Sequence, residues 1–127
     1  MGHWEVDTDH EKNRLYLTLD GQLSVEEVKT AADEVIEAAE TLEPGFDQVN
    51  DMSGFQAADP EALEHIERGK RGIVEAGVAA TCRVVSESTT GQMQFDRAGE
   101  EEEAYAVAKA ESFEQAEKLL EKRRQQA

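Results

Sequence analysis

The chain has 127 residues, 39% of them hydrophobic, and its 29 acidic and 13 basic residues give a net charge of −16. This length predicts a single domain, 1–127, with a hydrophobic core. The charge argues against nucleic acid and anionic membrane surfaces as partners, because their phosphates attract Lys and Arg. No apolar run approaches the ~18 residues of a membrane span, and no secretory signal is recognisable. We therefore expect no stable membrane insertion and a cytoplasmic location.

The acidic residues are spread along the whole sequence, which is typical of proteins from a salty cytoplasm. A partner with a basic surface is the alternative reason for such a charge. Like charges repel one another in dilute buffer, whereas at ~1 M salt the screening length falls to about 3 Å. We predict a substantially higher melting temperature in molar salt than in dilute buffer, measured by circular dichroism. Equal melting temperatures would exclude the halophilic interpretation.

Hydrophobic periodicity predicts strands and helices in alternation after an initial hairpin. In chain order we expect strands and helices over 4–8 (strand), 15–19 (strand), 24–42 (helix), 46–52 (strand), 59–76 (helix), 79–86 (strand), 88–98 (helix, presenting Met93), 105–108 (strand) and 112–124 (helix). The order ββαβαβαβα predicts an α/β fold with a mixed, mostly parallel sheet of about five strands and with helices packed on it.

Several local signals place the ends of these elements. Asp20-Gly21 is expected to end the second strand. Ser24 and Glu27 form a capping box at the start of the first helix. Asp59 is expected to cap the next helix, with Pro60 in its first position.

Two helices have a clear apolar stripe. In the helix over 59–76 the stripe is expected to contain Leu63, Ile66, Ile73 and Val74. In the last helix it is expected to contain Phe113, Ala116, Leu119 and Leu120. Ser112 and Gln115 predict a second capping box at the start of that last helix.

A family resemblance rests on residues 51–63, read as a strand end, a short polar loop and a helix start. The segment resembles the signature of the STAS domain, the fold of anti-sigma-factor antagonists such as SpoIIAA. There a strand ends in Asp-Leu, and eight residues after that Asp comes Asp-Ser-Ser-Gly-Leu, whose second serine is the phosphorylated switch. Asp51 and Asp59 match the two aspartates, Leu63 matches the leucine, and Glu61 stands in place of the switch serine. Asn50-Asp51 is similar to the Asn-Asp of SpoIIAA-like proteins of unassigned function.

This segment is also the candidate partner-binding or regulatory site, with Asp51, Ser53, Phe55, Asp59 and Glu61 as its residues. Ligand sites of parallel sheets gather beyond the carboxyl ends of the strands, and helix N-termini favour anions. Glu61 has three interpretations: a phospho-like lock, an abandoned site, or an ordinary first-turn glutamate. Ser53 is either an alternative phosphorylation site or a turn residue. Phe55 is expected to point inward as the corresponding residue does in the resembling domains; if it were exposed it would be an anchor for a partner.

The remaining reactive residue types predict no catalytic residue, no metal site and no cofactor. Cys82 lies in an apolar run and is expected to be a small buried side chain. His65 is expected to face outward. The spacing of His3, Asp7, Asp9 and His10 matches no metal motif. The run 100–103 is expected to be a solvated turn, because like charges repel.

The predicted function is a non-enzymatic protein-interaction or regulatory module without the usual switch serine. The alternative, implied by the resemblance, is a small-molecule or lipid carrier with a pocket between the sheet and the helix over 59–76. The expected partner is accordingly an unidentified protein or a small apolar ligand, and homo-oligomerisation is left open.

Overall fold

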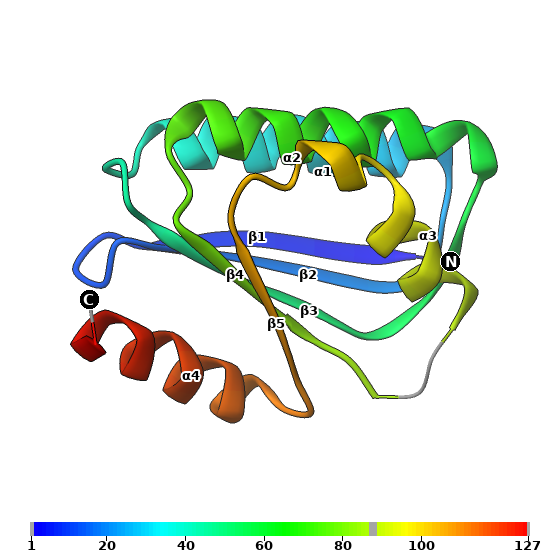
Figure 1. The fold of residues 1–127 in the computed structure, drawn as a ribbon. Helices are drawn as coiled ribbons and strands as arrows, with labels where there is room; N and C mark the ends of the chain where they lie inside the picture. Colours follow the sequence, from blue (N-terminus) through cyan, green and yellow to red (C-terminus); the bar gives the residue numbers. More distant parts are fainter. Residues whose placement is uncertain (1, 87–88, 127) are drawn as a thin grey trace.

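The computed structural model describes residues 2–86 and 89–126 (Figure 1). Its elements are β1 (His3–Asp9), β2 (Arg14–Leu23), α1 (Val25–Glu40), β3 (Asp47–Ala58), the 3₁₀ turn η1 (Pro60–Ala62), α2 (Leu63–Ala76), β4 (Ala80–Val84), α3 (Thr90–Arg97), the 3₁₀ turn η2 (Glu100–Glu102), β5 (Ala106–Ala110) and α4 (Phe113–Gln126). Among these residues no helix has the length and apolar character needed to cross a membrane.

The strands form one sheet in the order β1-β2-β3-β4-β5. β1 and β2 pair as an antiparallel hairpin, and each later strand is parallel to its neighbour. α1 and α2 lie side by side on one face, α3 packs on the same face near the end of β3, and α4 covers the opposite face (Figure 1). This arrangement confirms the predicted mixed, mostly parallel sheet and the order ββαβαβαβα.

Each face of the sheet has its own core. The larger core lies under α1 and α2 and includes Leu15, Leu17, Leu19, Val28, Val35, Phe46, Met52, Phe55, Ile66 and Ile73. The smaller core lies under α4 and includes Val49, Cys82, Val84, Ala116 and Leu120. Burial also raises the pKa of the Cys82 thiol. The expectation that Cys82 is a small buried side chain is therefore confirmed.

The second strand does not end at Asp20-Gly21, so that prediction is wrong. β2 continues to Leu23 through two irregularities in its pairing with β3, between Thr18 and Asp20 and between Gly21 and Gln22. Gly21 has a φ of +71°, which a glycine adopts at no steric cost. The dipeptide therefore bends the strand instead of stopping it, because β3 supplies partners on the far side of the bend.

The predicted loop after Met52 is also wrong, because β3 continues through it to Ala58. Phe55 and Ala58 are buried along this extension, as is Met52 at its start. A Cβ at Gly54 would overlap the end of the Asp20 side chain, so the glycine leaves room for that carboxylate beside β3. The apolar contacts and the extended β2 together outweigh the turn-forming composition of the segment.

The helix starts agree only in part with the predicted caps. The capping box of α1 is confirmed: Ser24 Oγ accepts from Glu27 N at 3.2 Å, and Glu27 Oε1 accepts from Ser24 N at 2.9 Å. Asp59, however, makes no side-chain capping bond, so that prediction is wrong. Its backbone N–H still donates to β2, and Pro60 opens a 3₁₀ turn. The first α-helical residue is therefore Leu63, beyond the reach of the Asp59 carboxylate.

The end of α2 depends on Gly77, which has a φ of +100° in the left-handed region. Its backbone N–H donates to the carbonyls of Ile73 and Val74. This is the ordinary glycine termination of a helix.

α3 begins at Thr90 within the predicted range 88–98, and Ser88 lies outside the described residues. Met93 is 47% exposed, as expected. Gln94 joins this helix to β3, because its side-chain amide accepts from Ala58 N at 2.9 Å and donates to Ala58 O at 3.0 Å. α3 thus packs against the end of β3 beyond Asp51, the last residue of β3 that pairs with β4.

The apolar stripe of α4 is narrower than predicted. Ala116 and Leu120 are buried, but Leu119 is exposed and Phe113 is 46% exposed, stacked on Tyr16 with ring centroids 5.5 Å apart. The capping box is also incomplete: Ser112 caps Gln115 N, but the side chain of Gln115 accepts from Glu111 N instead.

Ion pairs supply the remaining attachment of α4. Arg14, on β2, is fully buried and donates to Asp47 of β3 and to Glu117 of α4. Arg124 of α4 lies 3.0 Å from the same Asp47 carboxylate. These charges connect α4 to β2 and β3 in addition to its apolar contacts.

Candidate functional site

The five predicted site residues do not form one site. Asp51 and Ser53 form a local pair, in which Asp51 Oδ1 accepts from the backbone N at 3.1 Å and from the hydroxyl at 2.7 Å. Asp59 and Glu61 are exposed at the far end of β3. The eight residue-to-residue steps from Asp51 to Asp59 correspond to roughly 25 Å of extended chain at ~3.3 Å per residue. Phe55 is fully buried between them, so it points inward and does not contact a partner directly.

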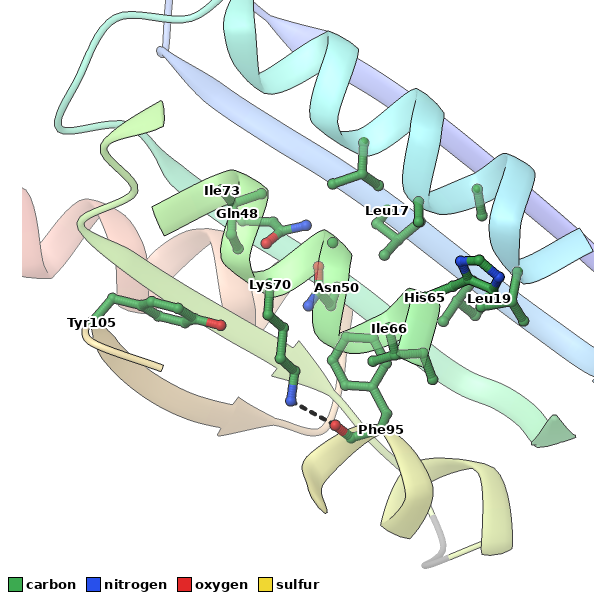
Figure 2. Close-up of a pocket in the computed structure, with 15 residues that line it drawn as sticks. Leu17, Leu19, Gln48, Asn50, His65, Ile66, Lys70, Ile73, Phe95 and Tyr105 are labelled. Carbon is green, nitrogen blue, oxygen red and sulfur yellow. Dashed lines mark hydrogen bonds between the residues drawn. The ribbon is translucent and has the colours of Figure 1, made fainter. Parts of the chain in front are cut away.

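A different site lies inside the fold, between the sheet and α1 and α2. Here a cavity of about 50 Å³ opens between β2, β3 and the two helices (Figure 2). One wall is apolar and is formed by Leu17, Leu19, Val28, Ala31, Ala32, Val35, Ile66 and Ile73. Gln48, Asn50, His65, Lys70 and Tyr105 also contribute to the lining, together with Phe95, but most of the cavity surface is apolar. A small cavity therefore lies at the place where the alternative function, a carrier, would have its pocket.

Two polar residues of the lining belong to an unusual row on the two central strands. Gln48 and Asn50 of β3 stand in register with Thr81 and Arg83 of β4, and all four side chains are buried. Buried parallel strands are normally almost continuously apolar. Within the described residues, Gln48 Oε1, Asn50 Oδ1, Thr81 Oγ1 and Arg83 Nε have no hydrogen-bond partner. Each unsatisfied buried group costs about 1–3 kcal/mol.

Two buried cations lie beside this row. Lys70 is 3% exposed, and its Nζ lies 2.6 Å from Phe95 O and 2.9 Å from Glu103 Oε2. Arg83 is equally buried and donates to Asp96 and to the same Glu103 carboxylate. Both cations lie over the Phe95 ring, at 4.8 and 5.1 Å from its centroid. Burial, followed by the charge of Arg83, lowers the pKa of Lys70.

Two sequence-based expectations are corrected at this site. His65 does not face outward: its side chain is 17% exposed and lines the cavity, because α1 packs beside α2. Glu103 does not belong to a solvated turn: its side chain is 12% exposed, because it is the counter-ion of Lys70 and Arg83. Among the described residues no group of His, Cys, Asp and Glu could hold a metal ion.

Lys70 and Arg83 were missed, although the sequence contains a weak signal for each. Lys70 follows Ile66 by four residues and precedes Ile73 by three, which places it on the buried stripe of its helix. Arg83 interrupts the apolar run of its strand. Neither position reveals its counter-ion, since Glu103 comes from a separate segment of the chain.

The two tyrosines of the chain should titrate abnormally. Burial and the hydrogen bond to Glu117 raise the pKa of Tyr16 to about 12, and burial and the charge of Glu103 raise the pKa of Tyr105 to about 12. Because the folded state favours the protonated tyrosine, each side chain contributes its full stabilisation below the unfolded-state pKa of ~10. This contribution to the free energy of unfolding is lost as the pH rises towards 12. We expect ultraviolet absorbance at alkaline pH to show no phenolate near pH 10 in the folded protein, but normal titration in urea. Phenolate formation near pH 10 without unfolding would contradict both assignments.

The arrangement of strands and helices identifies the fold. A mixed five-stranded sheet with α1, α2 and α3 on one face and α4 on the other is a SpoIIAA-like fold. The chain is similar to the crystal structure of an uncharacterised DUF3478-family protein from Shewanella loihica PV-4, which is described as having a SpoIIAA-like fold. The TM-score is 0.65 and the identity 13%, over 94% of this chain and 93% of the other. No protein-family model and no curated protein matches the sequence. The predicted resemblance is thereby confirmed at the level of the fold.

Proposed function

We propose that this domain is a non-enzymatic binding module of SpoIIAA-like type, and that the cavity between the sheet and α2 receives a small ligand. The observation that carries the proposal is the pair of buried amide side chains of Gln48 and Asn50, two residues of the cavity lining (Figure 2), whose oxygens have no hydrogen-bond partner among the described residues. Buried polar groups are almost always hydrogen-bonded to protein, water or ligand. A ligand or ordered water in the cavity would satisfy both.

The lining of the cavity indicates what kind of ligand would fit. The apolar wall favours a hydrocarbon part, and the amides favour one polar group. The volume of about 50 Å³ is far below the ~300 Å³ or more of ordinary ligand pockets. A lipid chain would require α1 and α2 to separate, so a small molecule is the better candidate.

Narrowing the cavity should abolish binding without harming the fold. Gly69 lines the cavity, and a Cβ there would lie 3.8 Å from Ala32 Cβ, which is an ordinary contact. Gly69→Ala should therefore fold well, with up to ~1 kcal/mol gained from helix propensity. Three small compounds are titrated in turn into ¹⁵N-labelled protein and followed by NMR: sodium propionate, propionamide and 1-propanol. We expect at least one of them to shift the side-chain amide signals of Gln48 and Asn50 in a saturable way. The same compound should not shift them in Gly69→Ala.

The control for this experiment is Glu64→Ala, a substitution at an exposed position of the same helix, which should bind as the wild type does. If none of the three compounds shifts the amide signals of the wild type, or if Gly69→Ala binds equally well, the proposal fails.

A second candidate, a protein-interaction surface around the end of β3, is favoured by one observation. Met93 is 47% exposed on α3, the helix that is hydrogen-bonded to this part of β3. Its test is a pull-down at native salt with wild type, Glu61→Ser, Met93→Glu and the remote control Lys29→Met. Loss of the same protein from the two surface variants alone would support this candidate, and equal recovery from all four would contradict it.

A further inference from the structure

We propose that the part of the β1–β2 hairpin that α4 leaves uncovered is a docking surface for a basic segment of a partner protein, and that an arginine of this segment stacks on Phe113. This surface lies on the opposite side of the sheet from the cavity, so the inference does not depend on the proposed cavity ligand. It rests on an uncovered sheet face, on carboxylates outside any ion pair of the described residues, and on an exposed aromatic ring.

α4 covers only part of its side of the sheet. Its buried residues Ala116 and Leu120 pack on β3 and β4. The hairpin extends beyond this contact, and a hollow of about 350 Å³ lies between the hairpin and the first half of α4. This volume reaches the ~300 Å³ at which ordinary binding sites begin, so the hollow has room for a large side chain.

Glu5, Asp7 and Asp9 line this hollow in a row along β1. Asp7 stands directly opposite Tyr16 of β2 in the antiparallel register, and Tyr16 donates to Glu117 of α4 at 2.8 Å. Opposite residues of such a pair lie on the same face of the sheet, so the row is on the α4 side. Neighbouring carboxylates of the row are roughly 7 Å apart along the strand, which matches alternate side chains of an extended segment.

The row has an uncompensated negative charge. Within residues 2–86 and 89–126, Glu5, Asp7 and Asp9 take part in no ion pair. Asp7 accepts from the backbone N–H of Thr8 at 2.8 Å, which orients the carboxylate without neutralising it. Lys12 also lines the hollow, but its ion pair is with α4. A basic partner would complement this face, both in the complex and during the encounter.

Phe113 adds an aromatic surface to the same hollow. Its ring stacks on Tyr16, yet Phe113 is almost half-exposed, so part of the ring is open to a partner. A guanidinium can lie flat on an aromatic ring and donate two parallel hydrogen bonds to a neighbouring carboxylate. An ammonium lacks this planar contact. We therefore expect the surface to prefer arginine to lysine.

The test uses three synthetic peptides: Gly-Arg-Gly-Arg-Gly-Arg-Gly, its lysine analogue, and its citrulline analogue, which keeps the shape of arginine without the charge. Each is titrated into ¹⁵N-labelled protein at one fixed ionic strength, and dissociation constants are obtained from the backbone amide shifts of Asp7 and Phe113. We expect the arginine peptide to bind about tenfold or more tightly than the citrulline peptide, because charged donors form stronger hydrogen bonds to carboxylates. The lysine peptide should bind roughly twofold to fivefold more weakly than the arginine peptide, since it lacks the stacked cation.

Two variants and a matched control identify the groups responsible. Asp7→Asn keeps the oxygen that accepts from Thr8 and should weaken the arginine peptide about twofold to fivefold, the contribution of one exposed ion pair. Phe113→Leu keeps an apolar side chain without the ring and should make the arginine and lysine peptides bind equally. Glu26→Gln, at an exposed position of α1 on the other face of the sheet, changes the net charge as Asp7→Asn does and should leave the affinity unchanged.

Several outcomes would overturn the inference. They are equal binding of the arginine and citrulline peptides, the absence of saturable shifts, or a preference for arginine that persists in Phe113→Leu. Equal weakening by Glu26→Gln and Asp7→Asn would show that the diffuse charge of −16 attracts the peptide, and not this face. If spermidine shifts the same signals and binds at least as tightly as the arginine peptide, the surface belongs to a polyamine and the assignment to a protein segment is wrong.

Discussion

Arg14→Met should lower the free energy of unfolding by about 3–5 kcal/mol, because it leaves the buried Asp47 carboxylate without its closest counter-ion. Arg14 is fully buried and also contacts Glu117, so the substitution should loosen α4 as well as destabilise β2. Urea denaturation followed by circular dichroism measures the loss. Such a loss is a large part of the ~5–15 kcal/mol by which a domain is stable.

Two further variants show whether charge is the cause. Lys118→Met removes an exposed cation of α4 and should change stability by no more than ~0.5 kcal/mol. Adding Asp47→Asn to Arg14→Met should recover part of the loss, because the uncompensated charge is then gone. A loss below ~1 kcal/mol for Arg14→Met would show that α4 is held mainly by its apolar contacts.

Phe55→Ala should cost about 3–5 kcal/mol, the usual range for a fully buried aromatic side chain. The matched control is Phe113→Ala, since Phe113 is half-exposed and stacks on Tyr16. We expect the control to cost no more than ~1.5 kcal/mol, the contribution of one aromatic pair. The free energy of unfolding of both variants is measured by chemical denaturation. The two values can be compared directly if the free energy falls with denaturant concentration at the same slope in both variants.

The result at Phe55 also bears on function. If the substitution costs no more than the control does, residues 53–58 are not an integral strand and Phe55 is available to a partner. If the cost is large, any loss of binding in Phe55→Ala reflects damage to the fold.

Elements with strong local signals were predicted well. The capping box of Ser24 and Glu27 determines where α1 begins, and Gly77 determines where α2 ends. Alternating apolar residues in 15–19 identify β2. These signals act within one or two turns of chain, so the neighbouring sequence contains all that they require.

The wrong boundaries arose where distant segments meet. Asp20-Gly21 and residues 53–58 have turn-like compositions, yet each segment is the other's partner across the sheet. Pairing and burial of Phe55 and Ala58 outweigh the local preference. The residues of the predicted site lie apart for the same reason: the extended strand between Asp51 and Asp59 places them at different positions along β3.

The sequence by itself determined the class of fold and the order of its elements, because these depend on the periodicity of apolar residues along the chain. Only the tertiary structure decided where a ligand site can lie. Lys70, Arg83 and Glu103 come from α2, β4 and the segment after η2, and Gln48 and Asn50 come from β3. These side chains come together beside the cavity only when α2 packs over β3 and β4. No local sequence pattern specifies that α2 packs there.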